Sequence, residues 1–340
     1  MEEKKVSIIT PCYNGESYIY RFLNSLLTQN YQNVELIFVN DGSTDKTEEV
    51  FMSYKPRLEA MGWTVIYLKT AHKNQAAALN AGLKKFSGEY LMWPDSDDIL
   101  YPTHIADKVK LMEDNPDCGI GFNVADEAWE DNLGEIVRQM RRTHDGEKDD
   151  LHNDLLVAPS RIFFGGIGNI VRASAFLDVV PDRDIYEGDC GQNFQMLYPI
   201  SVKYKACYIE KSLALRVKRK ASHSNQWVYN EPTRIFDHED TFLHTIARAN
   251  IPAEQKTKDI VAIVNFYEKR AAKYENEMKA RQLATEKKTV AATPTPHPEV
   301  PKDDVFYLLG LPILKIKRSQ NYCKAKLFGI ITLFKMKTIK

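Results

Sequence analysis

The residues of this chain with the clearest capacity for chemistry are three aspartates, Asp95, Asp97 and Asp98. They directly follow the apolar run at residues 90–93, which is typical of a buried strand. Like charges this close together need a cation or several hydrogen-bond donors to hold them. The alternative is a solvated acidic turn. An EF-hand calcium loop is excluded, because Leu100 and Ala106 stand where that loop requires glycine and glutamate.

The first hundred residues alternate between short apolar runs and segments with helical periodicity. The apolar runs predict four strands, at residues 6–10, 34–39, 64–68 and 89–93. Helices between them give an α/β fold with a Rossmann-like, mostly parallel sheet covered on both faces. Ligands of such sheets bind beyond the carboxyl ends of the strands. Polar residues that follow the strands, among them Asn14 and Asp41, are therefore expected to meet the aspartates at one edge.

The residues at this edge limit the kind of ligand that it can bind. The chain has no G-x-G-x-x-G and no G-x-x-x-x-G-K-[ST] sequence, so neither a dinucleotide fold nor a P-loop is supported. Without a glycine-rich cradle, a bound diphosphate would need a metal, for which Asp95 and Asp97 are the available ligands. Tyr13 can stack on a base and Asp41 can accept a base N–H. The pattern thus favours a nucleotide whose phosphates reach a metal.

Four segments resemble, in the right order, family 2 glycosyltransferases of the GT-A fold. They are residues 6–14, 39–45, 78–83 and 94–98, and the likeness is close over residues 4–125 and looser over the next hundred. The resemblance implies an inverting transferase, of the bacterial surface-polysaccharide type, that uses a nucleoside-diphosphate sugar with Mn²⁺ or Mg²⁺. The donor is most often a UDP-sugar, and the sugar a hexose or N-acetylhexosamine.

The resemblance also assigns site residues. Asp95-Ser96-Asp97 would be the D-x-D motif, with Asp95 and Asp97 on the metal and Ser96 near the donor. The residues implied to line the nucleoside pocket or contact the donor are Pro11, Tyr13, Asn14, Asp41 and Lys73. The basic stretch at residues 216–224 would close over the diphosphate, with His223 as a third metal ligand or a contact to the leaving group, although such a stretch is more often a solvated surface.

The general base of the resembling family is less clear in this chain. Gln192-Asn193 occupies the place of the usual acidic pair, and an amide is no base at neutral pH. We expect Asp189, or else Glu187, to deprotonate the acceptor, and Gln192, Asn193 and Trp93 to contact the sugar or the acceptor. The glycine-rich residues 165–169 line the sugar pocket or form only a turn. A helix over residues 102–115 is expected to carry His104 and Lys108 in solvent.

The C-terminal third has a different composition. We expect a GT-A domain over residues 1–235, with a nucleotide-binding half to 100 and an acceptor half from 101, then a helical extension over 236–288 and a proline-containing linker over 289–304. Residues 305–340 carry seven lysines, one arginine and no acidic residue. Mixed with large apolar residues, they predict an anchor on anionic lipid, the alternative being a β-hairpin or helix that packs on the body or on the partner of a homodimer.

Taken together, the sequence predicts an enzyme of cell-surface polysaccharide synthesis that acts on a glycan or lipid-linked acceptor. Five scattered cysteines without C-x-x-C spacing, and no run of 18 apolar residues, indicate a cytoplasmic protein at the inner membrane face. The acidic body argues against nucleic acid as a partner. A nucleotidyltransferase, and a non-catalytic sugar-nucleotide binder or scaffold with the same fold, are the rival interpretations.

Overall fold

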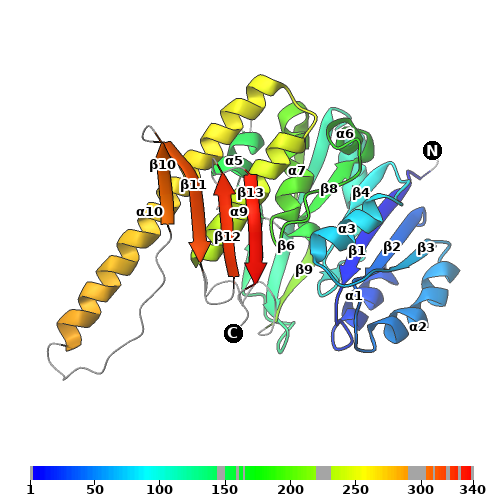
Figure 1. The fold of residues 1–340 in the computed structure, drawn as a ribbon. Helices are drawn as coiled ribbons and strands as arrows, with labels where there is room; N and C mark the ends of the chain where they lie inside the picture. Colours follow the sequence, from blue (N-terminus) through cyan, green and yellow to red (C-terminus); the bar gives the residue numbers. More distant parts are fainter. Residues whose placement is uncertain are drawn as a thin grey trace. The chain divides into compact units, whose positions relative to one another are not determined.

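The computed structural model describes residues 3–143, 150–157, 161–163, 165–219 and 231–289, and four strands between residues 304 and 337. The chain divides into two compact units, Met1–Tyr267 and Glu268–Lys340 (Figure 1). The first unit holds the large sheet and the residues predicted to carry chemistry, so it is described first.

Half of the large sheet is parallel and follows the predicted alternation of strands and helices. Its order is β3-β2-β1-β4. The strands are β1 (Val6–Cys12), β2 (Val34–Asn40), β3 (Thr64–Lys69) and β4 (Tyr90–Met92). Every residue of β2 is buried, as a parallel strand covered on both faces requires. The expected strands are all present, with bounds that differ by up to two residues.

Helices cover both faces of this parallel part because alternate residues of β1 face opposite sides. Ile8 lies in one apolar cluster with Phe22 of α1 (Ile19–Leu26) and Phe51 of α2 (Thr47–Ala60). Ile9, on the other face, meets α3 (Gln75–Leu83), where a Cβ added to Gly82 would lie 2.3 Å from its Cγ2. Glycine at position 82 therefore lets α3 approach the sheet.

Beyond β4 the sheet is mixed, with four antiparallel pairs and one parallel pair, the one between β6 and β9. The order beyond β4 is β8-β6-β9-β5, and β7 pairs with β6. These strands are β5 (Ile99–Leu100), β6 (Cys118–Trp129), β7 (Arg138–Met140), β8 (Asn169–Arg172) and β9 (Lys205–Lys218). β6 is almost wholly buried, yet it contains Gly119, Gly121 and Asn123, which interrupt the apolar pattern of a strand.

The expectation that His104 and Lys108 are solvated was wrong. Both side chains are buried where α4 (His104–Asp114) packs against β6 and β9. The Lys108 Nζ donates to the carbonyls of Ile167 and Asn169, each at 2.9 Å, and the His104 Nδ1 lies 2.8 Å from the Leu213 oxygen. Burial lowers the pKa of each group well below its ordinary value.

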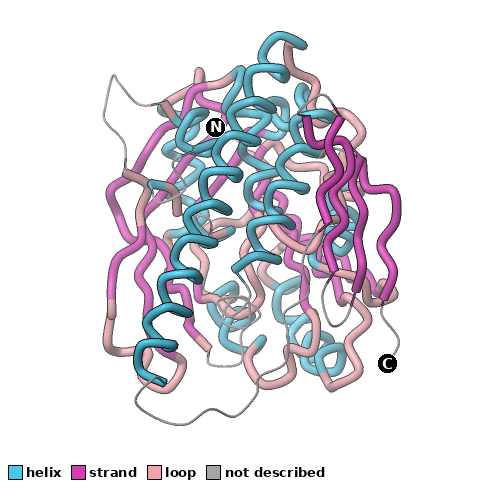
Figure 2. The backbone as a smooth tube through the Cα atoms, turned by 60° about the vertical axis from the view of Figure 1, so that its left-hand side comes forward, coloured by secondary structure: helices cyan, strands magenta, loops and turns pink. Residues whose placement is uncertain are grey.

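Further helices complete the first unit. They are α5 (Leu151–Val157), the 3₁₀ turn η3 (Gly166–Gly168), α6 (Ala173–Val179), α7 (Gln192–Lys203), α9 (Glu231–Arg248) and the start of α10 (Ala253–Thr289). Phe242 of α9 stacks on Phe194 of α7, with ring centroids 3.5 Å apart. The long helix α10 stands out in Figure 2. No helix among the described residues is long and apolar enough to cross a membrane.

The second unit contains the rest of α10 and a separate antiparallel sheet. Its order is β10-β11-β12-β13, from Asp304–Leu308, Leu311–Arg318, Tyr322–Leu327 and Ile331–Lys337. Of the two forms expected for residues 305–340, the backbone is thus closer to the β-hairpin, extended to four strands.

Candidate active site

The carboxyl ends of β1, β2 and β4 meet at one edge of the sheet, as the strand order predicted. Cys12 and Asn40 are register partners at the ends of β1 and β2, and the Asp41 N–H donates to the Cys12 carbonyl at 2.9 Å. Beyond them, the Asn14 Oδ1 accepts the Thr44 N–H at 2.9 Å. Asn14 has a φ of 49°, which asparagine tolerates better than most residues. Its side chain therefore joins the two loops that follow β1 and β2.

Asp41 and Tyr13 form one end of this edge together with a residue that the sequence analysis missed. The rings of Tyr13 and His72 stack with centroids 3.7 Å apart and planes 10° apart. The His72 Nδ1 lies 2.9 Å from the Asp41 Oδ2, and the Lys73 N–H donates to the Asp41 Oδ1 at 3.3 Å. The only signal for His72 was its place just after β3. Pro11 lies within β1, opposite Val39.

The three aspartates have different neighbours. Asp95 accepts from the Gln75 amide at 2.8 Å, and Asp97 accepts from the Arg219 guanidinium at 2.9 and 2.6 Å. Burial, and then the charge of Asp97, raise the pKa of Asp95 to about 6, a sign that little positive charge compensates it. Asp98 is buried and accepts the Val217 N–H at 3.0 Å, so its role is structural.

Ser96, the middle residue of the D-x-D sequence, is buried beside the end of β1. Its side chain is buried and hydrogen-bonds to Cys12 and Tyr18, while the Arg219 guanidinium lies over the Tyr18 ring at 3.9 Å. Burial raises the pKa of the Cys12 thiol to about 12. His223, expected as a third metal ligand, lies outside the described residues.

The two base candidates lie beside the amino end of α3. The Lys73 ammonium forms an ion pair with Glu187. The Asn74 amide donates to the Glu187 carbonyl at 3.2 Å and to the Asp189 Oδ1 at 3.5 Å. Both Glu187 and Asp189 are exposed. Residues from the nucleotide-binding half therefore contact the segment expected to supply the base.

The predicted acceptor contacts lie around Trp93. The Trp93 Nε1 donates to the Asn193 Oδ1 at 2.5 Å, and Gln192 is the half-buried first residue of α7. The glycine-rich turn also lies against this strand end, because a Cβ added to Gly166 would lie 2.1 Å from the Trp93 carbonyl oxygen. The fold thus brings Trp93, Asn193 and the turn together.

Comparison with known proteins identifies the family. A model described as glycosyl transferase family 2 matches residues 7–171. Residues 7–171 of this chain are a glycosyl transferase family 2 region. A glycosyltransferase of Rickettsia typhi is 38% identical over 126 residues, which are 36% of this chain and 37% of that protein. The glycosyltransferase GlyA of Streptococcus pneumoniae is 25% identical over 267 residues, 74% of this chain and 36% of that protein. The chain therefore spans little more than a third of the length of these relatives.

Solved structures confirm the predicted GT-A fold. The chain is similar to S. aureus TarS in complex with UDP-GlcNAc, with a TM-score of 0.55 and 21% identity over 77% of this chain and 72% of that one. A mannosyltransferase from Pyrobaculum calidifontis, in complex with GDP-Man and Mn²⁺, gives a TM-score of 0.55 at 19% identity, covering 86% of this chain and 77% of that one.

The aspartates at the strand ends fit a divalent cation that takes only one or two ligands from the protein. Among the described residues, no three histidine, cysteine, aspartate or glutamate side chains form a metal-binding group. Mg²⁺ in particular is usually held by one or two carboxylates together with substrate phosphates and water. Asp95 and Asp97 supply such a pair of oxygen donors, of which Asp97 also accepts from Arg219.

Proposed function

We propose that this chain transfers a hexosyl or N-acetylhexosaminyl group from a nucleoside-diphosphate sugar, preferably a UDP-sugar, to a glycan hydroxyl. The observation that carries the proposal is the convergence of Asp41, Tyr13 and the Asp95–Asp97 pair at the strand ends of a family 2 sequence. Complexes of TarS with UDP-GlcNAc and of the mannosyltransferase with GDP-Man support a nucleotide-sugar donor.

The mechanism that we propose is a single displacement with inversion at the anomeric carbon. Asp189, with Glu187 as the alternative, takes the proton of the acceptor hydroxyl while that oxygen attacks the donor sugar. The bond from the sugar to the diphosphate breaks in the same step. Lys73, paired with Glu187 and bonded through its backbone to Asp41, links the base segment to the nucleoside end. A divalent cation held by Asp95 and Asp97 would supply positive charge to the leaving diphosphate.

Release of nucleoside diphosphate from UDP-, GDP- and dTDP-sugars, with Mn²⁺ or with EDTA, tests this function. We expect release from one donor class, dependent on metal and reduced by orders of magnitude in Asp97→Asn. Asp114→Asn is the matched control, because Asp114 is exposed and pairs with Lys110 one helical turn away. Donor binding without release, even with lipid-linked glycans present, would favour the non-catalytic sugar-nucleotide binder instead.

We further propose that the second unit holds the enzyme on an anionic membrane surface, where a lipid-linked glycan of cell-surface polysaccharide synthesis is the acceptor. The composition supports this, because residues 305–340 carry seven lysines, one arginine and no acidic residue. Each basic residue near an anionic surface contributes about 1 kcal/mol to binding. Flotation of the full chain with phosphatidylglycerol-containing vesicles, but not with pure phosphatidylcholine vesicles, is the expected result; equal flotation with both would overturn it.

A further inference from the structure

The segment between α6 and α7 carries both base candidates but has no regular structure of its own. Residues 180–191 contain no helix or strand. Glu187 and Asp189 are exposed near its end, so their positions depend on contacts that other elements make with the segment. Lys73 and Asn74 contact Glu187 and Asp189 directly, and a set of buried contacts falls on two successive residues just before them, Ile185 and Tyr186.

Two buried side-chain amides each pair with the backbone of one of these residues. The Asn80 Nδ2 donates to the Ile185 carbonyl at 2.9 Å, and the Ile185 N–H donates to the Asn80 Oδ1 at 2.8 Å. The Gln195 Nε2 donates to the Tyr186 carbonyl at 2.9 Å, and the Tyr186 N–H donates to the Gln195 Oε1 at 2.6 Å. Asn80 and Gln195 are 2% and 1% exposed. We call these four residues the amide clamp.

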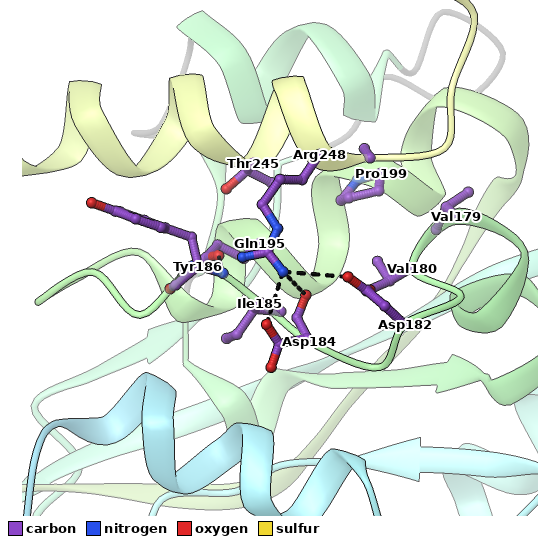
Figure 3. Close-up of a pocket in the computed structure, with 11 residues that line it drawn as sticks. Val179, Val180, Asp182, Asp184, Ile185, Tyr186, Gln195, Pro199, Thr245 and Arg248 are labelled. Atoms are coloured by element: carbon purple, nitrogen blue, oxygen red, sulfur yellow. Dashed lines mark hydrogen bonds and ion pairs between the residues drawn. The ribbon is translucent and has the colours of Figure 1, made fainter. Parts of the chain in front are cut away.

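The amide clamp connects the two halves of the site. Asn80 belongs to α3, whose N-cap Asn74 contacts Glu187 and Asp189. Gln195 belongs to α7, two residues after Asn193, which accepts from Trp93. Figure 3 shows Gln195 beside Ile185 and Tyr186, with Arg248 nearby. Because the helices on both sides hold these two successive residues, Ile185 by Asn80 and Tyr186 by Gln195, the segment cannot shift without breaking several buried hydrogen bonds.

We propose that Asn80 and Gln195 are positioning residues that fix the Glu187–Asp189 turn against the donor site. This inference rests on the proposed transferase function. A side-chain amide presents a donor and an acceptor side by side to the C=O and N–H of one residue. An ionised carboxylate has the same shape but cannot donate, so Asn80→Asp and Gln195→Glu each leave one buried carbonyl without its donor.

The test compares these variants with Gln29→Glu. Gln29 is another buried amide bonded to backbone, since its Nε2 donates to the Tyr101 carbonyl at 2.9 Å and its Oε1 accepts the Ile105 N–H at 3.3 Å. Two quantities are measured on the full chain. One is hydrogen exchange of a peptide spanning residues 182–190. The other is UDP release from the best UDP-sugar with water as acceptor, resolved into kcat and KM.

We expect both clamp variants to lose about tenfold or more of the exchange protection of this peptide and to lower kcat by about 10- to 100-fold, with KM changed less than about threefold. Gln29→Glu should leave both quantities at the wild-type level. Unchanged exchange, or a fall in kcat no larger than that of Gln29→Glu, would overturn the inference. If Asn80→Asp does not fold, Gln195→Glu decides. If the wild type releases no UDP from any donor, the proposed function fails, and exchange alone decides whether the clamp holds the segment.

Discussion

The protonation state of Lys108 predicts how the stability of the fold changes with pH. This lysine is fully buried, and its Nζ donates to the carbonyls of Ile167 and Asn169, which flank the end of η3. A neutral amine has two N–H groups, which these two carbonyls satisfy, whereas an ammonium would bring a third N–H and a buried charge. Burial accordingly lowers the pKa of Lys108 well below its ordinary value.

Stability must therefore depend on pH through this residue. In the unfolded chain Lys108 keeps its ordinary pKa of about 10.4, so it binds a proton that the folded chain lacks. Folding stability then rises with pH throughout the window above the folded-state pKa and below the unfolded one. Within that window each pH unit adds about 1.4 kcal/mol to the free energy of unfolding. Lys108→Met retains an apolar stem of similar length but removes the titrating group, so its stability lacks this increment.

Urea unfolding of the wild type and Lys108→Met at pH 8, 8.5 and 9 measures the effect. The comparison must be between the two proteins, because burial also raises the pKa of the thiols of Cys12, Cys118, Cys190 and Cys207. Those thiols stay protonated in the folded chain while the unfolded ones ionise, so they lower stability as pH rises in both proteins. A difference between wild type and variant that does not grow with pH would refute the neutral amine.

Two further substitutions test buried contacts of the first unit, each by urea unfolding against a matched control. Gly166→Ala should lower the free energy of unfolding by about 1 to 3 kcal/mol, because the new Cβ would lie 2.1 Å from the Trp93 carbonyl oxygen. Gly134→Ala should change it little, because no atom lies nearer than 3.8 Å to that Cβ. Equal effects of the two substitutions would contradict the close packing of the turn. Arg142→Met should cost about 3 to 5 kcal/mol, because it leaves the buried Asp154 carboxylate, 2.7 Å away, without this partner. Arg141→Met breaks an exposed pair with Glu210 and should cost under about 1 kcal/mol; a similar loss for both arginines would argue against the buried pair.

The parallel half of the fold could be predicted because its strands are short, apolar and separated by periodic helices. The convergence of Asp41 with Asp95 and Asp97 followed from the same pattern, since strand ends in such a sheet share one edge. β6 could not be predicted, because its glycines and Asn123 interrupt the apolar pattern that marks a strand. Its strand conformation depends on pairing with β8 and β9, which come later in the sequence.

The contacts that complete the site depend on residues far apart in the sequence. Asn80 and Ile185, or Asp97 and Arg219, carry no local mark of their pairing. The same holds for Lys108. Its charge predicted an exposed side chain, but the carbonyls of residues 167 and 169 accept its hydrogen bonds in the interior. His72 was missed because a histidine after a strand is usually unremarkable, and only the stacked Tyr13 ring and the Asp41 carboxylate reveal its place.

Binding of UDP by isothermal titration calorimetry, with Mn²⁺ present, tests the central claim most directly when wild type and Asp41→Asn are compared. Asparagine keeps one oxygen for the Lys73 N–H but removes the charge and one acceptor from the nucleoside end. A lost hydrogen bond to a charged group is worth about 1.5 to 3 kcal/mol, so the Kd should rise by about 10- to 100-fold. No binding of UDP by the wild type, or equal affinity of the two proteins, would contradict a nucleotide site at the strand ends.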